Sequence, residues 1–151
     1  LVNKLKASAL FNQAYALGEN LGAVAIDMAW AMLAPGVKIT DVDAFERKAL
    51  DERGLYLSQV PPRYRSTYFL HVFGGGYAAG YYSYLWTQVL ESNIFDWFVE
   101  HGGMTAENGQ RLRDLILSRG NSQPVKDLFA AFTGRLAPDM KSLIRARGLA
   151  D

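Results

Sequence analysis

The chain of 151 residues contains no cysteine and only two histidines, His71 and His101. The lack of cysteine excludes disulfides, thiolate-bound zinc and cysteine nucleophiles, and it favours a cytoplasmic location. The formal net charge of +1 gives no broad electrostatic basis for binding nucleic acid or a membrane surface. No run of about 18 apolar residues is present, so we expect no membrane-spanning helix.

The remaining composition is that of an ordinary globular protein, half hydrophobic and about a fifth charged. A chain of this length can bury a core, and we predict one helical domain over residues 1–151. The first residue is Leu1 rather than Met. We therefore expect the chain to be a piece of a longer protein.

Helical spacing of apolar residues dominates the N-terminal half. Residues 1 to about 34 follow this spacing, with a possible break at Gly18, and Pro35-Gly36 ends the segment. A second helix is predicted from an N-cap at Thr40 to a stop at Gly54, with Glu46 on its solvated face. The connector that follows contains Pro61-Pro62, which excludes regular helix.

Two arginines, Arg63 and Arg65, end this connector. They could hold a carboxylate, but we favour surface or loop-fixing roles for both.

The C-terminal half predicts further helices. Residues 76 to about 100 read as one long central helix, followed by two helices capped by Thr105 and Ser122, with Val125 among the buried residues of the second. Pro138-Asp139 opens a last short helix. Gly134 ends the helix that Ser122 would begin. Because no period-two pattern is sustained, and YFLHVF is the only strand-like run, we predict an all-α fold.

The stretch 66–90, STYFLHVFGGGYAAGYYSYLWTQVL, contains no Lys, Arg, Asp or Glu but five tyrosines. On the predicted helix Tyr77, Tyr81 and Tyr84 follow the spacing i, i+4, i+7 and share a face, whereas Tyr82 points away and is expected to be structural. A neutral phenol can donate a hydrogen bond to a carbonyl oxygen or to an oxyanion. The row of tyrosines therefore predicts either a peptide-binding surface or an aromatic core stripe.

The same stretch contains His71 and the triplet Gly74-Gly75-Gly76. A lone histidine in an apolar run is usually a core residue, although His71 could also hydrogen-bond a substrate backbone. The glycines permit three interpretations. A phosphate loop lacks the lysine and the βαβ unit it needs, a bare helix start is the second, and a flexible loop that approaches a ligand is the third.

The runs HVFGGGYAAGYYSYLW and EHGGMTAENGQRLRDLILSRGNS, followed by Gly-Arg at 134–135, resemble the C-terminal part of the thimet-oligopeptidase-like zinc metallopeptidases. DVDAFERKAL and VPPRYRSTYF fit the same family, in its subgroup of bacterial peptidyl-dipeptidases, also called dipeptidyl carboxypeptidases. The resemblance covers nearly the whole chain. It implies the multi-helical C-terminal part of a thermolysin-like or neurolysin-like helical metallopeptidase, which releases C-terminal dipeptides from oligopeptides.

The resemblance also implies roles for individual residues. Tyr84 matches the catalytic tyrosine that hydrogen-bonds the tetrahedral oxyanion. His71, Tyr77 and Tyr81 match residues that contact bound peptide, and Gly75 and Gly76 belong to the loop that faces the substrate channel.

The resemblance further implies a single Zn²⁺ held by an HExxH helix and a downstream glutamate, with the HExxH glutamate activating water. This chain has no HExxH, because its two histidines lie thirty positions apart. We therefore expect no metal ligand here and no activity from this piece alone. Its expected partners are an oligopeptide substrate and the zinc-binding part of the same enzyme. The alternative is a stand-alone helical module that binds a peptide or a partner helix without catalysis.

Overall fold

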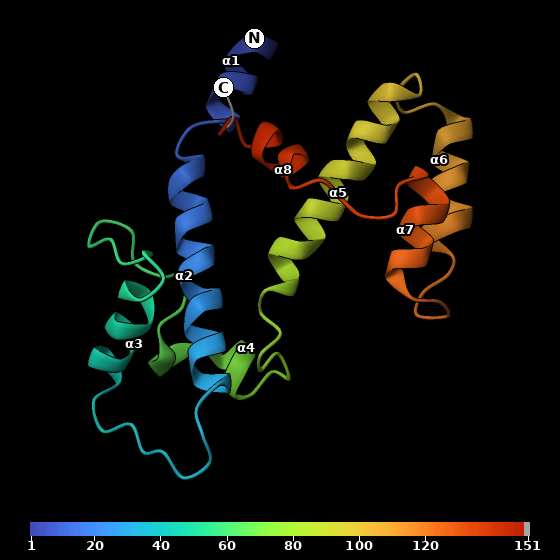
Figure 1. The fold of residues 1–151 in the computed structure, drawn as a ribbon. Helices are drawn as coiled ribbons and strands as arrows, with labels where there is room; N and C mark the ends of the chain where they lie inside the picture. The colour runs from blue at the N-terminus through green and yellow to red at the C-terminus, as the bar shows by residue number, and fades with distance from the viewer. Residues whose placement is uncertain (150–151) are drawn as a thin grey trace. The chain divides into compact units, whose positions relative to one another are not determined.

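A computed structural model describes residues 1–149, and the all-α prediction is confirmed (Figure 1). Apart from one isolated bridge between Leu57 and Val60, the described residues contain no β-structure. The elements are α1 (Val2–Ala9), α2 (Gln13–Ala31), α3 (Val42–Asp51), η1 (Ser66–Tyr68), α4 (Leu70–Phe73), α5 (Ser83–Glu100), α6 (Ala106–Leu112), the π-helical turn η2 (Arg113–Leu117), α7 (Val125–Thr133) and α8 (Met140–Ala146). Among these helices, none is long and apolar enough to cross a membrane.

The chain divides into two compact units, Leu1–Leu85 and Trp86–Asp151, each with its own hydrophobic cluster. The prediction of a single domain over residues 1–151 stays a prediction.

Helix α2 supplies the centre of the first unit. Its Ala23 and Ile26 are fully buried and pack with Phe69, which precedes α4, and with Val72 within α4. Gly22 permits the connector to approach closely, because a Cβ there would lie 3.1 Å from the Cβ of Pro62. The segment that leads into α4 therefore packs directly on α2.

The helix boundaries of this unit correct two predictions. The N-terminal segment breaks at residues 10–12, where Asn12 has a left-handed backbone (φ 56°), whereas α2 continues through Gly18. Helix α3 is capped by Asp41 rather than Thr40, because the Asp41 carboxylate accepts a 2.9 Å hydrogen bond from the Ala44 amide. The turn at Gly54 does have the predicted left-handed conformation, with φ 65°.

Glu46 does not lie on a solvated face of α3, contrary to the prediction. Its side chain is buried and accepts hydrogen bonds from Arg65 Nε and from the backbone amide of Ser66. The carboxylate thereby ties α3 to the end of the connector, a contact between residues about twenty positions apart. Helical periodicity cannot reveal such a partner.

The second unit is built around aromatic rings. Trp97 and Phe98 of α5 pack on the fully buried Phe132 of α7, with 4.5 Å between the ring centroids of Trp97 and Phe132. The Arg111 guanidinium lies over both rings of that pair and donates to the carbonyl oxygens of Ala131 and Phe132. Arg111 therefore joins α6 to α7 through both its charge and its hydrogen bonds.

Buried Asn93 connects α5 to the start of α8. Its side-chain amide donates to the Asp139 carbonyl oxygen at 2.9 Å, and its oxygen accepts from the Asp139 backbone amide at 2.8 Å. Asp139 in turn caps α8 by accepting from the Lys141 amide, so the last helix opens at Pro138-Asp139 as predicted.

The caps of the second unit follow the sequence with one exception. The Thr105 hydroxyl accepts from the Asn108 amide, and Gly134 ends α7 with φ 73°, both as predicted. The cap at Ser122 is wrong, because α7 begins at Val125 after Pro124. The first turn of α7 faces solvent, so Val125 is exposed rather than buried.

Candidate functional site

The predicted long helix over residues 76–100 is wrong at its start. Helix α5 begins at Ser83, and residues 74–82 form a series of turns, here called the tyrosine loop. Gly76 (φ 79°) and Ala79 (φ 56°) have left-handed backbones that a helix does not allow. YFLHVF is not a strand either, since it forms η1 and the short helix α4.

The tyrosine loop folds back onto α4. The Gly74 amide donates to the Leu70 carbonyl oxygen at 2.8 Å, and the Tyr77 amide donates to the His71 carbonyl oxygen at 3.0 Å. Gly75 passes so close to α4 that a Cβ would lie 3.0 Å from the His71 carbonyl oxygen. The glycines do not begin a helix, because α5 starts at Ser83, and Gly75 makes its close approach to the backbone of His71. A loop that approaches a ligand stays a prediction.

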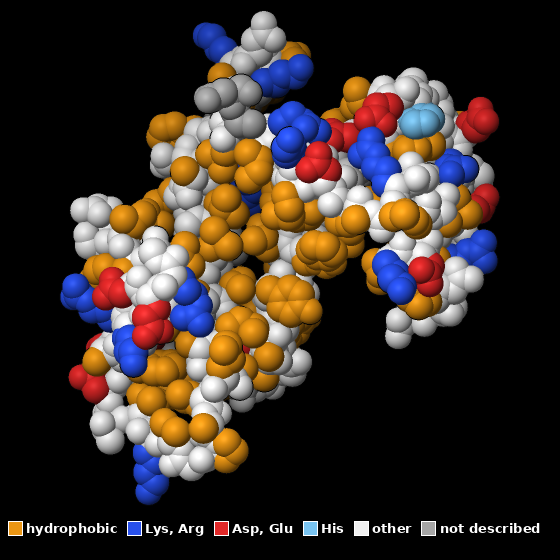
Figure 2. Space-filling model, in the orientation of Figure 1, with side chains coloured by type: hydrophobic (Ala, Val, Ile, Leu, Met, Phe, Trp, Pro, Cys, Tyr) orange, Lys and Arg blue, Asp and Glu red, His pale blue; other side chains and the backbone are white. Residues whose placement is uncertain are grey.

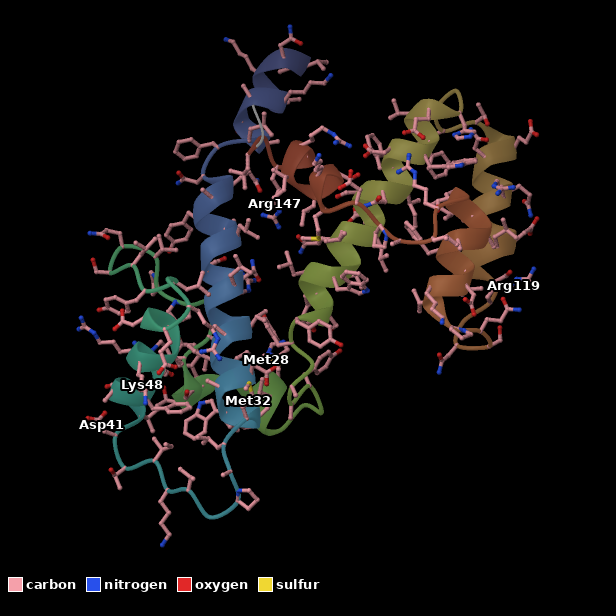
Figure 3. All side chains as sticks on the ribbon, viewed as in Figure 1. Met28, Met32, Asp41, Lys48, Arg119 and Arg147 are labelled. Atoms are coloured by element: carbon pink, nitrogen blue, oxygen red, sulfur yellow. The ribbon has the colours of Figure 1, made fainter. Side chains whose placement is uncertain are left out.

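Asp27 of α2 holds the other end of the tyrosine loop. Its carboxylate is fully buried and accepts hydrogen bonds from the backbone amides of Ala79 (2.8 Å) and Tyr81 (3.0 Å). In Figure 3, Met28, the next residue along α2, marks this level of the helix. Asp27 is not among the residues predicted for the site, although it is the single acid within the apolar run AVAIDMAWAM.

The rings of His71, Tyr77 and Tyr84, here called the tyrosine cluster, come together although they do not share a helix. The His71 ring centroid lies 6.1 Å from that of Tyr77 and 6.2 Å from that of Tyr84, and the two tyrosine rings stack at 5.6 Å. Tyr77 and Tyr84 are about 40% exposed, and His71 is half-buried. Figure 2 shows hydrophobic side chains gathered over α2 and around α4 on the face in view.

Tyr81 lies behind the tyrosine cluster. It is only 4% exposed and packs edge-on against Phe69 and Tyr64, with its ring centroid 5.6 Å from that of His71. Tyr82, expected to be structural, is instead half exposed. The structure therefore combines the two interpretations of the tyrosines: Tyr81 belongs to the core, whereas Tyr77 and Tyr84 reach solvent.

The surroundings keep two phenols protonated. A hydrogen bond with Tyr77 raises the pKa of Tyr84 above its ordinary value, and burial raises the pKa of Tyr81. An upward shift stabilises the neutral phenol, which is the form that donates. Because even an ordinary phenol is protonated at neutral pH, Tyr84 can act there as a hydrogen-bond donor to an incoming oxygen.

Both connector arginines have the loop-fixing role that the sequence favoured. Arg63 Nη1 lies 2.9 Å from Glu19 Oε1, and Arg65 pairs with Asp43 at 2.6 Å and with Glu46. These hydrogen bonds raise the pKa of both guanidinium groups. The two charges are thus directed to carboxylates of the chain itself.

The residues present do not fit a zinc ion. Within residues 1–149, no three His, Cys, Asp or Glu side chains are grouped so that they could hold a metal. The ring nitrogen Nδ1 of His101 lies 2.7 Å from the Trp97 carbonyl oxygen, and its ring stacks on Trp97 in the core of the second unit.

A pocket of about 480 Å³ lies between α3 and the connector. It is lined by residues such as Glu46 and Tyr56, and no member of the tyrosine cluster lines it.

Comparison with known proteins gives consistent matches. The model of peptidase family M3 matches residues 1–149. The dipeptidyl carboxypeptidase of Salmonella typhimurium is 50% identical over 149 residues, 99% of this chain and 22% of that protein. The dipeptidyl carboxypeptidase of Escherichia coli is 48% identical over the same shares. Oligopeptidase A of Escherichia coli is 48% identical over 81 residues, 54% of this chain and 12% of that protein. The chain therefore spans about a fifth of the two dipeptidyl carboxypeptidases.

Proposed function

Because the chain belongs to peptidase family M3, we propose that it forms part of a zinc-dependent peptidase that releases dipeptides from the C-terminus of oligopeptides. The similarity to two dipeptidyl carboxypeptidases along nearly the whole chain supports this substrate class. The observation that carries the role of this piece is the half-exposed pair Tyr77–Tyr84 beside His71.

In the proposed mechanism, Tyr84 donates its phenolic proton in a hydrogen bond to the oxygen of the scissile carbonyl as that oxygen becomes an oxyanion. Such a donor acts mainly in the transition state, because the charge it stabilises is largest there. In the structure, the Tyr84 hydroxyl forms a hydrogen bond with Tyr77. The substrate oxygen would take over this bond, and Tyr77 would turn to the peptide backbone.

His71 and the glycine backbone complete the proposed peptide contacts. The His71 ring borders both tyrosines of the tyrosine cluster and would hydrogen-bond a substrate backbone group. Gly76, where a Cβ would meet nothing within 4 Å, would leave the loop backbone open to a peptide, whereas Gly75 would act by letting the loop lie against the backbone of His71. Tyr81 would act from the core by supporting the His71 and Tyr84 rings.

The described residues offer no ligand set for zinc. We therefore propose that the metal and the general base come from another part of the same enzyme. Residues 1–151 alone would then bind peptide at most, without cleaving it.

The test compares the full-length enzyme with the isolated chain on peptides of defined length. We expect the enzyme to release the last two residues of an N-acylated peptide, as identified by mass spectrometry, and to lose this activity on chelation. We expect no cleavage by the chain 1–151 under the same conditions. Hydrolysis by the isolated chain would contradict the missing metal site, and binding without hydrolysis by the full-length protein would favour a binding module instead.

A further inference from the structure

We propose that Asp27 is a positioning residue for the tyrosine cluster: its buried carboxylate fixes the tyrosine loop on α2 and thereby sets where Tyr84 lies relative to His71. This inference rests on the proposed function for its effect on catalysis. The hydrogen bonds that define it can be tested without any assay of activity.

Asp27 is a costly residue at its position. It is fully buried on α2, in a stretch whose Ala23 and Ile26 are also fully buried and apolar. A buried carboxylate is tolerated only when hydrogen bonds replace its lost hydration. Here the two oxygens are divided between two donors, Oδ1 to the Ala79 amide and Oδ2 to the Tyr81 amide.

The two amides flank Gly80 in a turn whose backbone conformation is unfavourable for the residues that form it. Ala79 adopts φ 56°, a conformation that residues with a Cβ rarely adopt. The neighbouring bond from Gly80 N to the Tyr77 carbonyl oxygen closes one turn at 2.8 Å. Asp27 accepts from the amides of the residues before and after Gly80. These bonds favour the turn over an α5 that would extend N-terminally from Ser83 to the glycine triplet.

The position of Tyr84 follows from this turn. The Tyr84 amide bonds to the carbonyl oxygen of Tyr81, whose own amide is held by Asp27. His71 lies between Phe69 and Val72, which pack on the same α2 core, and its carbonyl oxygen also accepts from the Tyr77 amide. Helix α2 therefore serves as the common base for both halves of the tyrosine cluster, and Asp27 is its polar contact to the loop.

The test uses Asp27→Asn and Asp27→Ala in the full-length enzyme, with Asn93→Ala as the matched control. Asn93 is equally buried and also bridges backbone groups far along the chain, but it holds α8 and not the tyrosine loop. Asn at position 27 keeps the shape but turns an amide group toward one backbone donor. Ala removes both acceptors.

We expect amide exchange in residues 77–83 to accelerate roughly tenfold or more in both Asp27 variants, because the two hydrogen bonds of the Asp27 carboxylate that hold this loop are weakened or lost. We expect kcat to fall roughly ten- to a hundredfold with KM changed by less than about threefold, since misplacement of a transition-state donor acts on kcat. Asn93→Ala, at a similar loss of thermal stability, should leave both readouts unchanged.

Three results would overturn the proposal. The first is wild-type exchange at Ala79 and Tyr81 as fast as in an unstructured peptide, a measurement that needs no variant to fold. The second is unchanged exchange in residues 77–83 of the Asp27 variants. The third is an equal fall of kcat in Asn93→Ala. If the loop loosens as expected while Tyr84→Phe keeps full activity, the role of Asp27 in fixing the tyrosine loop is supported and the proposed role of Tyr84 is refuted.

Discussion

Replacing Glu46 by Gln should destabilise the protein far more than its charge alone would suggest. Glu46 is 2% exposed and accepts from both Arg65 Nε and the Ser66 amide. Gln retains one acceptor oxygen and places an amide group against the second donor. The substitution therefore removes a charge and leaves a polar group without a suitable partner in the same buried place.

The expected size follows from the exposure of each partner. Breaking a fully buried ion pair costs about 3–5 kcal/mol. The Arg65 side chain, however, is 39% exposed, so water can take over part of its hydration. We therefore expect a loss of about 2 kcal/mol, within the range for a hydrogen bond to a charged group. For a chain of this length, that corresponds to a fall in Tm of roughly 4–8 °C.

Glu100→Gln is the matched control. Glu100 pairs with Arg135 through contacts of 2.7 and 2.8 Å, but its side chain is 51% exposed. Such a surface pair contributes about 0–1 kcal/mol, so its Tm should fall little. Calorimetry or circular dichroism on both variants gives the comparison, and amide exchange at Ser66 localises the effect. Equal shifts in the two variants would refute the reasoning from burial.

Two further predictions concern the tyrosine loop. Gly75→Ala should lower kcat/KM about tenfold or more, because the added Cβ would crowd the His71 backbone. The control is Gly109→Ala, where a Cβ meets nothing within 4 Å, and it should leave activity intact. A normal kcat/KM for Gly75→Ala would contradict the close approach of Gly75 to His71. Burial raises the pKa of Tyr81, so its contribution to stability is complete below its ordinary pKa of about 10 and is lost as the pH rises through the higher folded pKa. Melting of wild type and Tyr81→Phe between about pH 8 and 11 should therefore show the steeper alkaline decline in the wild type, and parallel curves would count against the shift.

Local chemistry made much of the helical architecture predictable. Thr105, Asp139 and Gly134 act at helix ends because their backbone or side chains satisfy neighbouring groups within a few residues. The same logic failed at Thr40 and Ser122, where a nearby residue takes the N-cap position instead. Boundaries were therefore accurate where one residue was clearly suited to the end.

The tyrosine loop shows why the rest was not predictable. Tyr77, Tyr81 and Tyr84 have helical spacing, yet Asp27 captures the Ala79 and Tyr81 amides from more than fifty positions away. A long-range hydrogen bond of this kind leaves no local pattern. The family resemblance also named His71, Tyr77 and Tyr84, and their rings do lie together although periodicity gave the wrong backbone for them; their part in binding and catalysis stays a proposal.

The two buried carboxylates were also beyond prediction from the sequence. Acids are rarely buried without a partner, so a local pattern places Glu46 on a solvated face and gives no role to Asp27. Their partners, Arg65 and the backbone amides of Ser66 and of the tyrosine loop, lie on other segments. Only the tertiary structure brings donor and acceptor together.

The most direct test of the proposed role of this chain is kcat of Tyr84→Phe in the full-length enzyme, with Tyr82→Phe as the control for loss of an exposed phenol in the same segment. If the Tyr84 hydroxyl stabilises the oxyanion, kcat falls by about a hundredfold or more, while zinc content and the Tyr82→Phe rate stay at wild-type values. A Tyr84→Phe enzyme with wild-type kcat would contradict the account.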